Sequence, residues 1–379
     1  MNFELTDEHK AIKDAAKDFA ENEIAPTSVE RDLKAEFPFE IIKKLGELGF
    51  MGMMVSQDWG GAGMDTVSYV VALEEISKVD ASVGVIMSVN NSLVCYGLEE
   101  YGSDHIKENY LKPLASGQKL GAFCLSEPEA GSDATAQKST AELHGDHYIL
   151  NGMKNFITSG VNADYYVMQA VTDKSKGYKG ISTFLVEKAY EGVEIGKKED
   201  KLGIRSSDTC SIGLNNAKVP KENIIGEEGM GFKVAMTTLN GGRIGIAAQA
   251  LGIAQASLEA AVQYSKERKA FDAPIANLQA IQFKLADMCM NVEAARLLTL
   301  QAARKKDNNQ NYIREAAQCK LFASEVAVKN ALEAIQIHGG YGYVREYLVE
   351  RFLRDAKITE IYEGTSEIQR LVIAREILK

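Results

Sequence analysis

The sequence predicts a multidomain α+β chain, with a helical N-terminal domain, a central antiparallel β-barrel or sandwich, and a C-terminal helical bundle. In the first and last thirds, apolar residues recur every three or four positions, which is the spacing of packed helices. Between these regions, short runs of β-branched and aromatic residues are separated by clusters of Gly, Asn, Asp and Lys, a pattern typical of strands. The 379 residues are enough for two or three domains.

The N-terminal domain is expected to cover residues 1–120. Thr6 can cap a first helix. The helical spacing then returns in three segments: residues 39–48, 67–76 and 93–101. A glycine-rich loop at residues 59–63 lacks the Lys and Ser or Thr that complete a Walker-type phosphate loop, so we interpret it as a plain turn.

The central β domain is expected to cover residues 121–227. Its predicted strands are residues 148–150, 155–158, 164–171, 180–186 and 209–214. The segments between these strands are too short for helices, so an antiparallel sheet is favoured and a Rossmann fold is not. The glycine cluster at residues 339–342 follows a helical segment rather than a strand, so it does not fit a dinucleotide fingerprint.

The C-terminal bundle is expected to cover residues 228–379. One apolar stripe steps by four and three residues: Ile281, Leu285, Met288, Val292 and Ala295. Three further segments are predicted to be helical: residues 231–268, 311–337 and 366–378. Helices this long form a bundle whose apolar faces often pack against a second subunit.

Charge, cysteine and histidine content exclude several kinds of binding site. A formal net charge of -10 argues against a general surface for nucleic acid or for an anionic membrane. Five cysteines, odd in number and never in a CxxC pair, indicate neither a disulfide framework nor a zinc site, so we expect buried thiols in a reducing compartment. His144 and His147 lie around a predicted hairpin turn without a third ligand nearby, so no metal is expected.

Two further classes are disfavoured by what the sequence lacks. The first residues have neither the basic nor the apolar region of a signal peptide, and no apolar run is expected to span a membrane. We therefore expect a cytoplasmic protein. The sequence also lacks the GxSxG nucleophile elbow of a serine hydrolase.

The strongest candidate for a catalytic residue is Glu363. Its carboxylate lies between the aromatic Tyr362 and Gly364. A carboxylate against an apolar ring has a raised pKa, which suits a general base. The peptide alone is equally compatible with an acidic residue in the first turn of a final helix.

Residues 124–136 form a second candidate segment. Their Pro, Ala, Gly and Ser residues would make a narrow surface, with backbone N–H and hydroxyl donors facing a flat ligand. A connecting loop between domains explains the same residues equally well.

These segments resemble the acyl-CoA dehydrogenase family over essentially the whole chain, and most closely its bacterial short-chain, butyryl-CoA-type members. The resemblance rests on residues 124–136, on residues 336–343 continuing through Glu346 and Arg351 to Asp355, and on the peptide around Glu363. It implies a helical N-terminal domain, a central β domain, a C-terminal four-helix bundle, and FAD as the cofactor. In this family each FAD site is built from two subunits.

The resemblance also implies roles for particular residues. The FAD-binding positions would be Phe123, Leu125, Ser126, Gly131, Ser132, Phe156, Ile157, Thr158, Arg268, Phe271, Gln279, Gln336, Gly339, Gly340, Thr365 and Glu367. The substrate-binding positions would be Ser132, Asn240, Arg243 and Gly364. Phe156 stands where many relatives carry Trp, so a ring contact is kept without an indole hydrogen bond. Arg268 would neutralise the FAD pyrophosphate, although without the resemblance it reads as a surface residue.

Glu363 is the catalytic residue that the resemblance implies. It would remove the α-proton of an acyl thioester while the flavin accepts a hydride from the β-carbon. The thioester carbonyl would be held by the Glu363 backbone N–H and a ribityl hydroxyl of FAD. Some relatives carry the base just before the arginine that corresponds to Arg243, but this chain has Gly242 there, which strengthens Glu363.

The expected function is that of an FAD-dependent short-chain acyl-CoA dehydrogenase. It would form a trans-2-enoyl-CoA in fatty acid β-oxidation or butyrate metabolism, and would pass electrons to an electron-transferring flavoprotein. A homotetramer, arranged as a dimer of dimers, is expected by family. The alternatives are a dehydrogenase for a medium-chain, branched or aromatic acyl-CoA, an acyl-CoA oxidase, and a flavin-binding scaffold without turnover, which leaves Glu363 unexplained.

Overall fold

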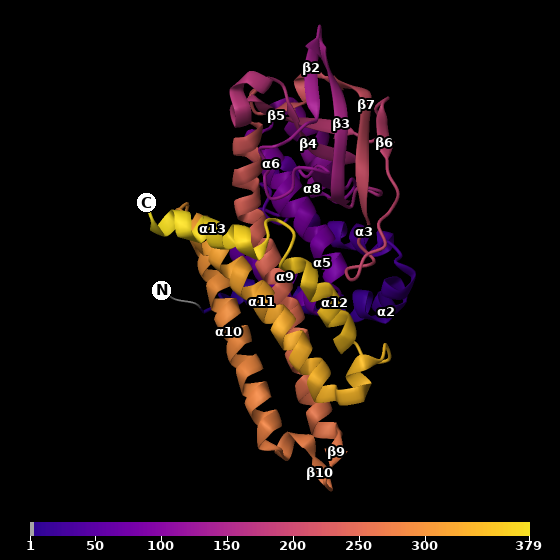
Figure 1. Ribbon diagram of the computed structural model, residues 1–379, viewed down its shortest axis with the longest axis vertical. Coiled ribbons are helices and arrows are strands. Elements are labelled where there is room, and N and C mark those ends of the chain that lie inside the picture. The colour runs from indigo at the N-terminus through magenta and orange to yellow at the C-terminus, as the bar shows by residue number, and fades with distance from the viewer. Residues whose placement is uncertain (1–3) are drawn as a thin grey trace.

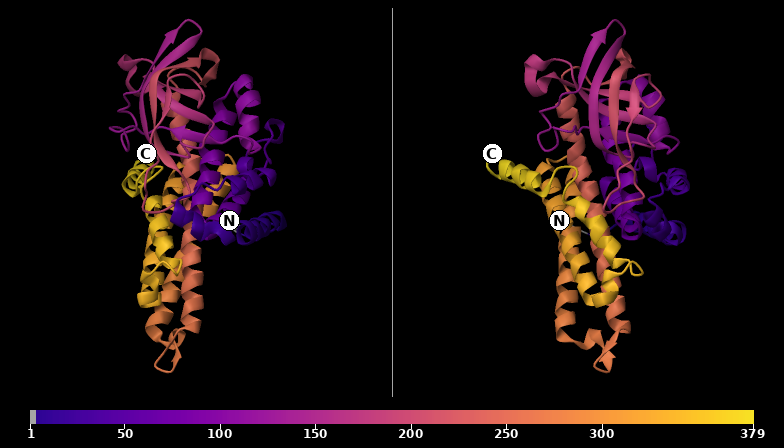
Figure 2. Two further views of the ribbon diagram at one scale, coloured as in Figure 1. Left: turned by 90° about the vertical axis from the view of Figure 1, so that its right-hand side faces the viewer. Right: turned by 45° about the vertical axis from the view of Figure 1, so that its right-hand side comes forward.

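The computed structural model describes residues 4–379 as an elongated molecule. The β domain lies at one end, and a small hairpin of β9 (Lys269–Ala270) and β10 (Ala273–Pro274) lies at the other (Figure 1). Helix α9 (Gly231–Glu267) runs between the two ends. The N-terminal helices lie to one side of α9 in both views of Figure 2. Helical domains therefore flank a sheet domain, which confirms the predicted fold class.

The N-terminal domain is helical, as expected. Its α-helices are α1 (Asp7–Phe19), α2 (Ala25–Lys34), α3 (Phe39–Glu47), α4 (Thr66–Val79), α5 (Ala81–Ser88), α6 (Tyr96–Tyr101), α7 (Asp104–Ile106) and α8 (Lys112–Ala115). Thr6 caps α1, because its hydroxyl accepts from the backbone N–H of His9 at 3.2 Å. A π-helical segment, Val89–Cys95, joins α5 to α6.

The β domain contains one eight-stranded sheet. Its strands are β1 (Gly121–Cys124), β2 (Thr140–His144), β3 (His147–Thr158), β4 (Tyr165–Val171), β5 (Ile181–Glu187), β6 (Val193–Ile195), β7 (Thr209–Pro220) and β8 (Ile224–Ile225). The order is β6-β7-β3-β2-β4-β5-β8, with β1 against β4. Most pairs are antiparallel, and His144 pairs with His147 across the predicted hairpin turn.

The sheet departs from the antiparallel expectation at β4. Strand β1 pairs with β4 in parallel, with Gly121 opposite Tyr165, and β2 adds one parallel pair, Thr140 with Val171. Parallel neighbours need a long connection. Residues 125–139 and the β2–β3 hairpin supply that connection between β1 and β4.

The C-terminal domain consists of α9, α10 (Gln279–Asp307), α11 (Ile313–His338), α12 (Val349–Thr359) and α13 (Ser366–Ile377). Small residues let α9 pass close to its neighbours. At Gly252, an added Cβ would lie 2.5 Å from the carbonyl oxygen of Glu74 on α4. Helix α11 ends at Gly339, whose φ of 61° favours glycine.

The structure corrects two expectations drawn from composition. Two helical stretches, Ala81–Tyr101 and Gly231–Glu267, are long and apolar enough to cross a membrane by length and composition, contrary to the expectation that no run reaches that length. Their most apolar windows are 94% and 78% buried within the protein, so these apolar faces pack in its core. Of the cysteines, Cys289 is exposed, whereas buried thiols were expected.

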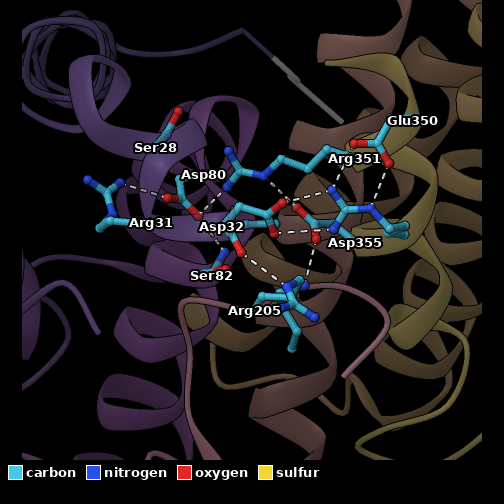
Figure 3. Close-up of polar contacts among 12 residues, drawn as sticks. Ser28, Arg31, Asp32, Asp80, Ser82, Arg205, Glu350, Arg351 and Asp355 are labelled. Carbon is cyan, nitrogen blue, oxygen red and sulfur yellow. Dashed lines mark hydrogen bonds and ion pairs between the residues drawn. The ribbon is translucent and has the colours of Figure 1, made fainter. Parts of the chain in front are cut away.

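A buried ion network joins the domains (Figure 3). Asp80, between α4 and α5, pairs with Arg31 of α2 at 2.8 Å and with Arg351 of α12 at 2.9 Å. Arg351 also pairs with Asp355, one turn further along α12, at 3.3 Å. These side chains are almost inaccessible to solvent, so each charge depends on its partners.

The same network fixes a loop of the β domain, residues 199–208. The backbone N–H of Ile204 donates to Asp355 at 2.5 Å, and Arg205 donates to the carbonyl oxygen of Asp32 at 3.0 Å (Figure 3). Asp32 in turn pairs with Arg354 of α12 at 2.7 Å. The ion network therefore holds α2, α12 and this loop against one another.

Candidate active site

A cavity of about 600 Å³ lies where the three domains meet. Residues of the network's own segments, Ile204 and Ile358, line it together with Val89 and Leu93 of the N-terminal domain. The sequence-predicted site residues that line it are Phe123, Leu125, Ser126, Gly131, Ser132, Phe156, Ile157, Thr158, Arg243, Glu363, Gly364 and Thr365. Two segments far apart in the chain, residues 124–136 and 361–369, are thus brought to the same cavity.

Glu363 lies in the turn between α12 and α13. The residue borders the cavity, but its Oε2 is buried and has no hydrogen-bond partner. Burial raises the pKa of Glu363 to about 7, and the positive charges of Lys320 and Arg243 oppose part of that rise. Among residues 4–379, no acceptor takes the backbone N–H of Glu363 either. The carboxylate and the N–H are both free to meet a ligand.

The turn that carries Glu363 has unusual backbone geometry. Glu363 and Gly364 have φ values of 53° and 93°, so two successive residues are left-handed. For a glutamate this conformation costs about 1–3 kcal/mol. The Gly364 carbonyl accepts hydrogen bonds from Lys320 Nζ at 2.7 Å and from Gln369 Nε2 at 2.9 Å, which hold the turn in place.

Position 242 on α9 faces the Glu363 carboxylate directly. A Cβ added to Gly242 would lie 2.2 Å from Glu363 Oε2 and 2.7 Å from Leu93. A side chain at position 242 and the Glu363 side chain would therefore occupy the same space. This explains in physical terms why the chain has glycine at one of these positions when glutamate is at the other.

Arg243 is the buried cation beside this pair. Its Nη1 donates to Asn240 Oδ1 at 2.7 Å, and its buried Nε has no partner within the described chain. Burial lowers the pKa of Arg243, and Glu363 acts in the opposite direction. Asn240 itself is not part of the cavity wall, so it acts on the site through Arg243.

The wall formed by the β domain is set by a bulge and by a buried ion pair. The β3–β7 register shifts between Lys154 and Ile157, and Phe156 adopts a φ of 55° that leaves its ring 68% exposed towards the cavity mouth. Lys154, fully buried, pairs with Glu127 at 2.7 Å. Glu127 also accepts from the backbone N–H of Lys138 at 2.6 Å, which fixes the ends of the 124–136 segment.

The other predicted residues lie elsewhere. Arg268, Gly339 and Gly340 line a second, open cavity of about 510 Å³ near the far end of the bundle, where the Arg268 guanidinium lies 5.5 Å from the ring centre of Tyr341. Phe271, in the β9–β10 hairpin, is 88% exposed. Gln279 begins α10, Gln336 is exposed near the end of α11, and Glu367 is exposed in the first turn of α13.

Sequence reasoning missed several polar residues of the first cavity region, among them Lys320, Gln369 and Lys201. Lys201 lines the cavity, and the other two hold the Glu363 turn. One signal for Lys320 was present, since it lies among small apolar residues on the buried face of α11. A lysine on such a face is rarely there for packing alone.

The cavity fits the cofactor that the resemblance implies. Phe123, Leu125 and Ile157 give it an apolar wall, and Ser126 and Thr158 place hydroxyl groups at that wall. Apolar walls with a few polar groups are typical of cofactor sites of this size. Among residues 4–379, no cluster of His, Cys, Asp or Glu could hold a metal ion.

A sheet domain between two helical domains, with a buried unpaired carboxylate at the cavity they share, fits an enzyme that uses a carboxylate as a base. Its family, whose members are oxidoreductases that act on a CH–CH group, is shown by the sequence. The N-terminal, middle and C-terminal domains of acyl-CoA dehydrogenases match residues 6–118, 122–217 and 229–378. The chain belongs to the acyl-CoA dehydrogenase family, which is a family of flavoproteins.

Individual relatives agree with this assignment. The short-chain specific acyl-CoA dehydrogenase of Clostridium acetobutylicum is 49% identical over 100% of both chains. The solved structure of butyryl-CoA dehydrogenase from Megasphaera elsdenii has a TM-score of 0.98 and 48% identity, again over 100% of both chains. A chain in a structure described as the electron transferring flavoprotein of Acidaminococcus fermentans has a TM-score of 0.99 and 50% identity over the same shares.

Proposed function

We propose that this protein is an FAD-dependent acyl-CoA dehydrogenase that converts a short-chain, butyryl-CoA-like thioester to the trans-2-enoyl thioester. The observation that carries the proposal is the Glu363 carboxylate, buried at the cavity wall without a partner and with its pKa raised to about 7. A base of this pKa suits removal of a weakly acidic α-proton near neutral pH. The names of the relatives from Clostridium acetobutylicum and Megasphaera elsdenii support the substrate class.

The chain's own residues have separate tasks in this reaction. Glu363 takes the α-proton onto its carboxylate, and its free backbone N–H donates to the thioester carbonyl oxygen as negative charge develops there. Arg243, oriented by Asn240, offers its unpaired Nε to the CoA portion of the substrate. Phe123, Phe156 and Thr158 form the wall that would hold FAD, which when bound supplies the acceptor for the β-hydride.

Dense packing behind the inner wall supports a short acyl chain. Val89 and Leu93 form this wall, and behind them the Tyr69 hydroxyl donates to Ser88 at 2.9 Å. A Cβ added at Gly245 would lie 2.5 Å from both oxygens. Tyr69 and Ser88 are both fully buried, so they would limit the length of an acyl chain on this side, and pocket depth sets acyl specificity.

The assembly and the electron carrier also belong to this proposal. Arg243 and Arg268 are 25 positions apart on or next to α9, which at 1.5 Å per residue separates them by about 37 Å. One dinucleotide cannot reach from the first cavity to Arg268 of the same chain, so a second copy would supply Arg268, Phe271 and Gln336. We propose a cytoplasmic homotetramer that reduces an electron-transferring flavoprotein, as the Acidaminococcus fermentans relative suggests.

Anaerobic addition of butyryl-CoA to the purified flavoprotein tests the reaction. We expect bleaching of the flavin spectrum, and a slower response to longer, branched or 3-phenylpropionyl thioesters. Glu363→Gln should lower the bleaching rate by about 10²–10⁴-fold, since a general base contributes that much. Glu191→Gln, at an exposed glutamate that does not line the cavity, is the control and should keep the parental rate.

Two results would overturn the proposal. A Glu363→Gln protein that bleaches at the parental rate would remove Glu363 as the base. Rapid formation of peroxide from butyryl-CoA in air would instead identify an acyl-CoA oxidase.

A further inference from the structure

Lys320 of α11 is a buried cation without an ion pair. Its side chain is inaccessible to solvent, and its Nζ donates to the neutral carbonyl oxygen of Gly364 at 2.7 Å. Among residues 4–379 no carboxylate lies within ion-pair distance of this Nζ, whereas the buried Lys154 has Glu127. An unpaired buried ammonium is destabilising, so its retention calls for a reason other than packing.

Lys320 is not the only donor that holds the Glu363 turn. Gln369 already donates to the carbonyl oxygens of both Glu363 and Gly364, at 3.3 and 2.9 Å, and it is a neutral donor. What Lys320 adds to this turn is a positive charge next to the residue that carries the free carboxylate.

The charged groups around this point come from several helices. Arg243 of α9 is the other cation near Glu363, and its charge also lowers the pKa of that carboxyl group. Glu360 and Glu367 lie at the two ends of the turn, and their negative charges raise the pKa of Lys320. Both lie nearer to solvent than Lys320 does. The hydroxyl groups of Tyr69 and Tyr362 also lie within range of Glu363, but burial raises the pKa of each, so they remain neutral.

We propose that Lys320 is a positioning residue for the catalytic base: it fixes the Glu363–Gly364 turn by its hydrogen bond, and its charge keeps Glu363 ionised inside an apolar cavity. The inference rests on the proposed function, in which Glu363 is the base. Its chemical reason is that closing the cavity over an acyl chain removes water from the carboxylate, which favours the protonated form. The Lys320 ammonium counteracts this effect without forming the ion pair that would block the carboxylate. Burial lowers the pKa of Lys320 to about 8, so this charge is present below that pH.

Two variants of Lys320 separate the charge from the hydrogen bond. Lys320→Gln keeps a neutral donor, and Lys320→Met removes both. We expect the pKa of Glu363 to rise by about one unit in both variants, so that the rate of flavin reduction falls about tenfold on the acidic side and recovers at higher pH. Lys306→Met, at a partly buried lysine of α10 that donates to Thr66, is the control and should leave the pH profile unchanged.

A direct titration makes the test independent of turnover. Infrared difference spectra of the substrate-free holoprotein, recorded as a function of pH, show the bands of protonated carboxyl groups. The band that is present in the parent protein and absent from Glu363→Gln belongs to Glu363. An unchanged Glu363 titration in both Lys320 variants would overturn the inference while leaving the proposed function intact. Parental turnover in Glu363→Gln would instead overturn the proposed function itself. Should Lys320→Met fail to fold, Lys320→Gln alone decides between the two outcomes.

Discussion

At the scale of single residues, Glu363 combines two features that destabilise a folded protein. Its backbone is left-handed, and its carboxyl group is buried without a hydrogen bond. A residue selected for stability would have neither feature. Such costs are typical of catalytic residues, where the free group is needed for the reaction.

The first prediction concerns stability rather than turnover. The pKa of Glu363 is about 7 in the folded protein and near 4.5 when unfolded. A folded pKa above the unfolded one means that the native state binds the proton more tightly, so stability falls as pH rises from about 4.5 to about 7 and is lowest above that. Glu363→Gln should therefore stabilise the ligand-free holoprotein by about 3 kcal/mol at pH 8 and have little effect at pH 4.5.

Chemical denaturation at both pH values measures this difference. Glu191→Gln, at an exposed glutamate, is the matched control and should behave like the parent protein at each pH. Equal effects of Glu363→Gln at pH 4.5 and pH 8 would show that the carboxyl group titrates normally in the fold.

The sequence identified Glu363 and the 124–136 segment because their chemistry is local. An acidic residue between a ring and a glycine, and a run of small and hydroxyl-bearing residues, are visible without a structure. Lys320 was not found, because its role depends on a hydrogen bond across 44 positions. The opposition of Gly242 and Glu363 is likewise a property of packing, although the sequence did exclude Gly242 as a base.

At the scale of elements, α12 explains why one helix was not predicted. Its charged residues Glu350, Arg351, Arg354 and Asp355 look like a solvated face in the sequence. In the structure Arg351 and Asp355 are buried in the network with Asp80, and this network holds α12 against the N-terminal domain. The long helices were predictable because their apolar stripes repeat over many turns, whereas β1, β2 and β6 are too short to show a pattern.

The second prediction tests this network. Arg351→Met leaves Asp80 with only Arg31, and leaves Asp355 buried without its cation. Breaking a buried pair in this way costs about 3–5 kcal/mol. Burial raises the pKa of Asp355 to about 6 even beside Arg351, and removal of this cation would raise it further. The carboxyl group of the variant would then be neutral at pH 5, so the loss should be smaller at pH 5 than at pH 8.

Urea unfolding of Arg351→Met at the two pH values measures the effect. Arg370→Met, at an exposed arginine paired with Glu325, is the matched control and should change stability by at most about 1 kcal/mol. A loss for Arg351→Met no larger than that of the control would show that the network contributes nothing to holding α12.

At the scale of the whole molecule, the residues implied for FAD binding fall into two groups at different parts of the chain. One group lines the central cavity, and the other lies near the β9–β10 hairpin at the far end of α9 (Figure 1). The separation follows from α9 being one unbroken helix of 37 residues, which matches the helix predicted over residues 231–268. In the proposed assembly, a second copy of the chain would bring the two groups together.

The last prediction follows from that separation. Phe271 exposes 88% of its surface on the β9–β10 hairpin. Both Phe271 and Asp272 have positive φ, which is a strained geometry, and no packing of the Phe271 ring within the described chain offsets that strain. We expect the ring to pack against a second copy, beside that copy's FAD. Phe271→Asp should therefore reduce both the size of the assembly and the flavin content, with the helical content of each protomer unchanged.

Sedimentation velocity measures the size of the assembly, and the flavin-to-protein absorbance ratio measures the flavin content. Leu143→Asp, at an exposed residue of β2, is the matched control. A Phe271→Asp protein that becomes monomeric yet keeps one FAD per chain would mean that a single protomer holds the whole cofactor, which the length of α9 argues against.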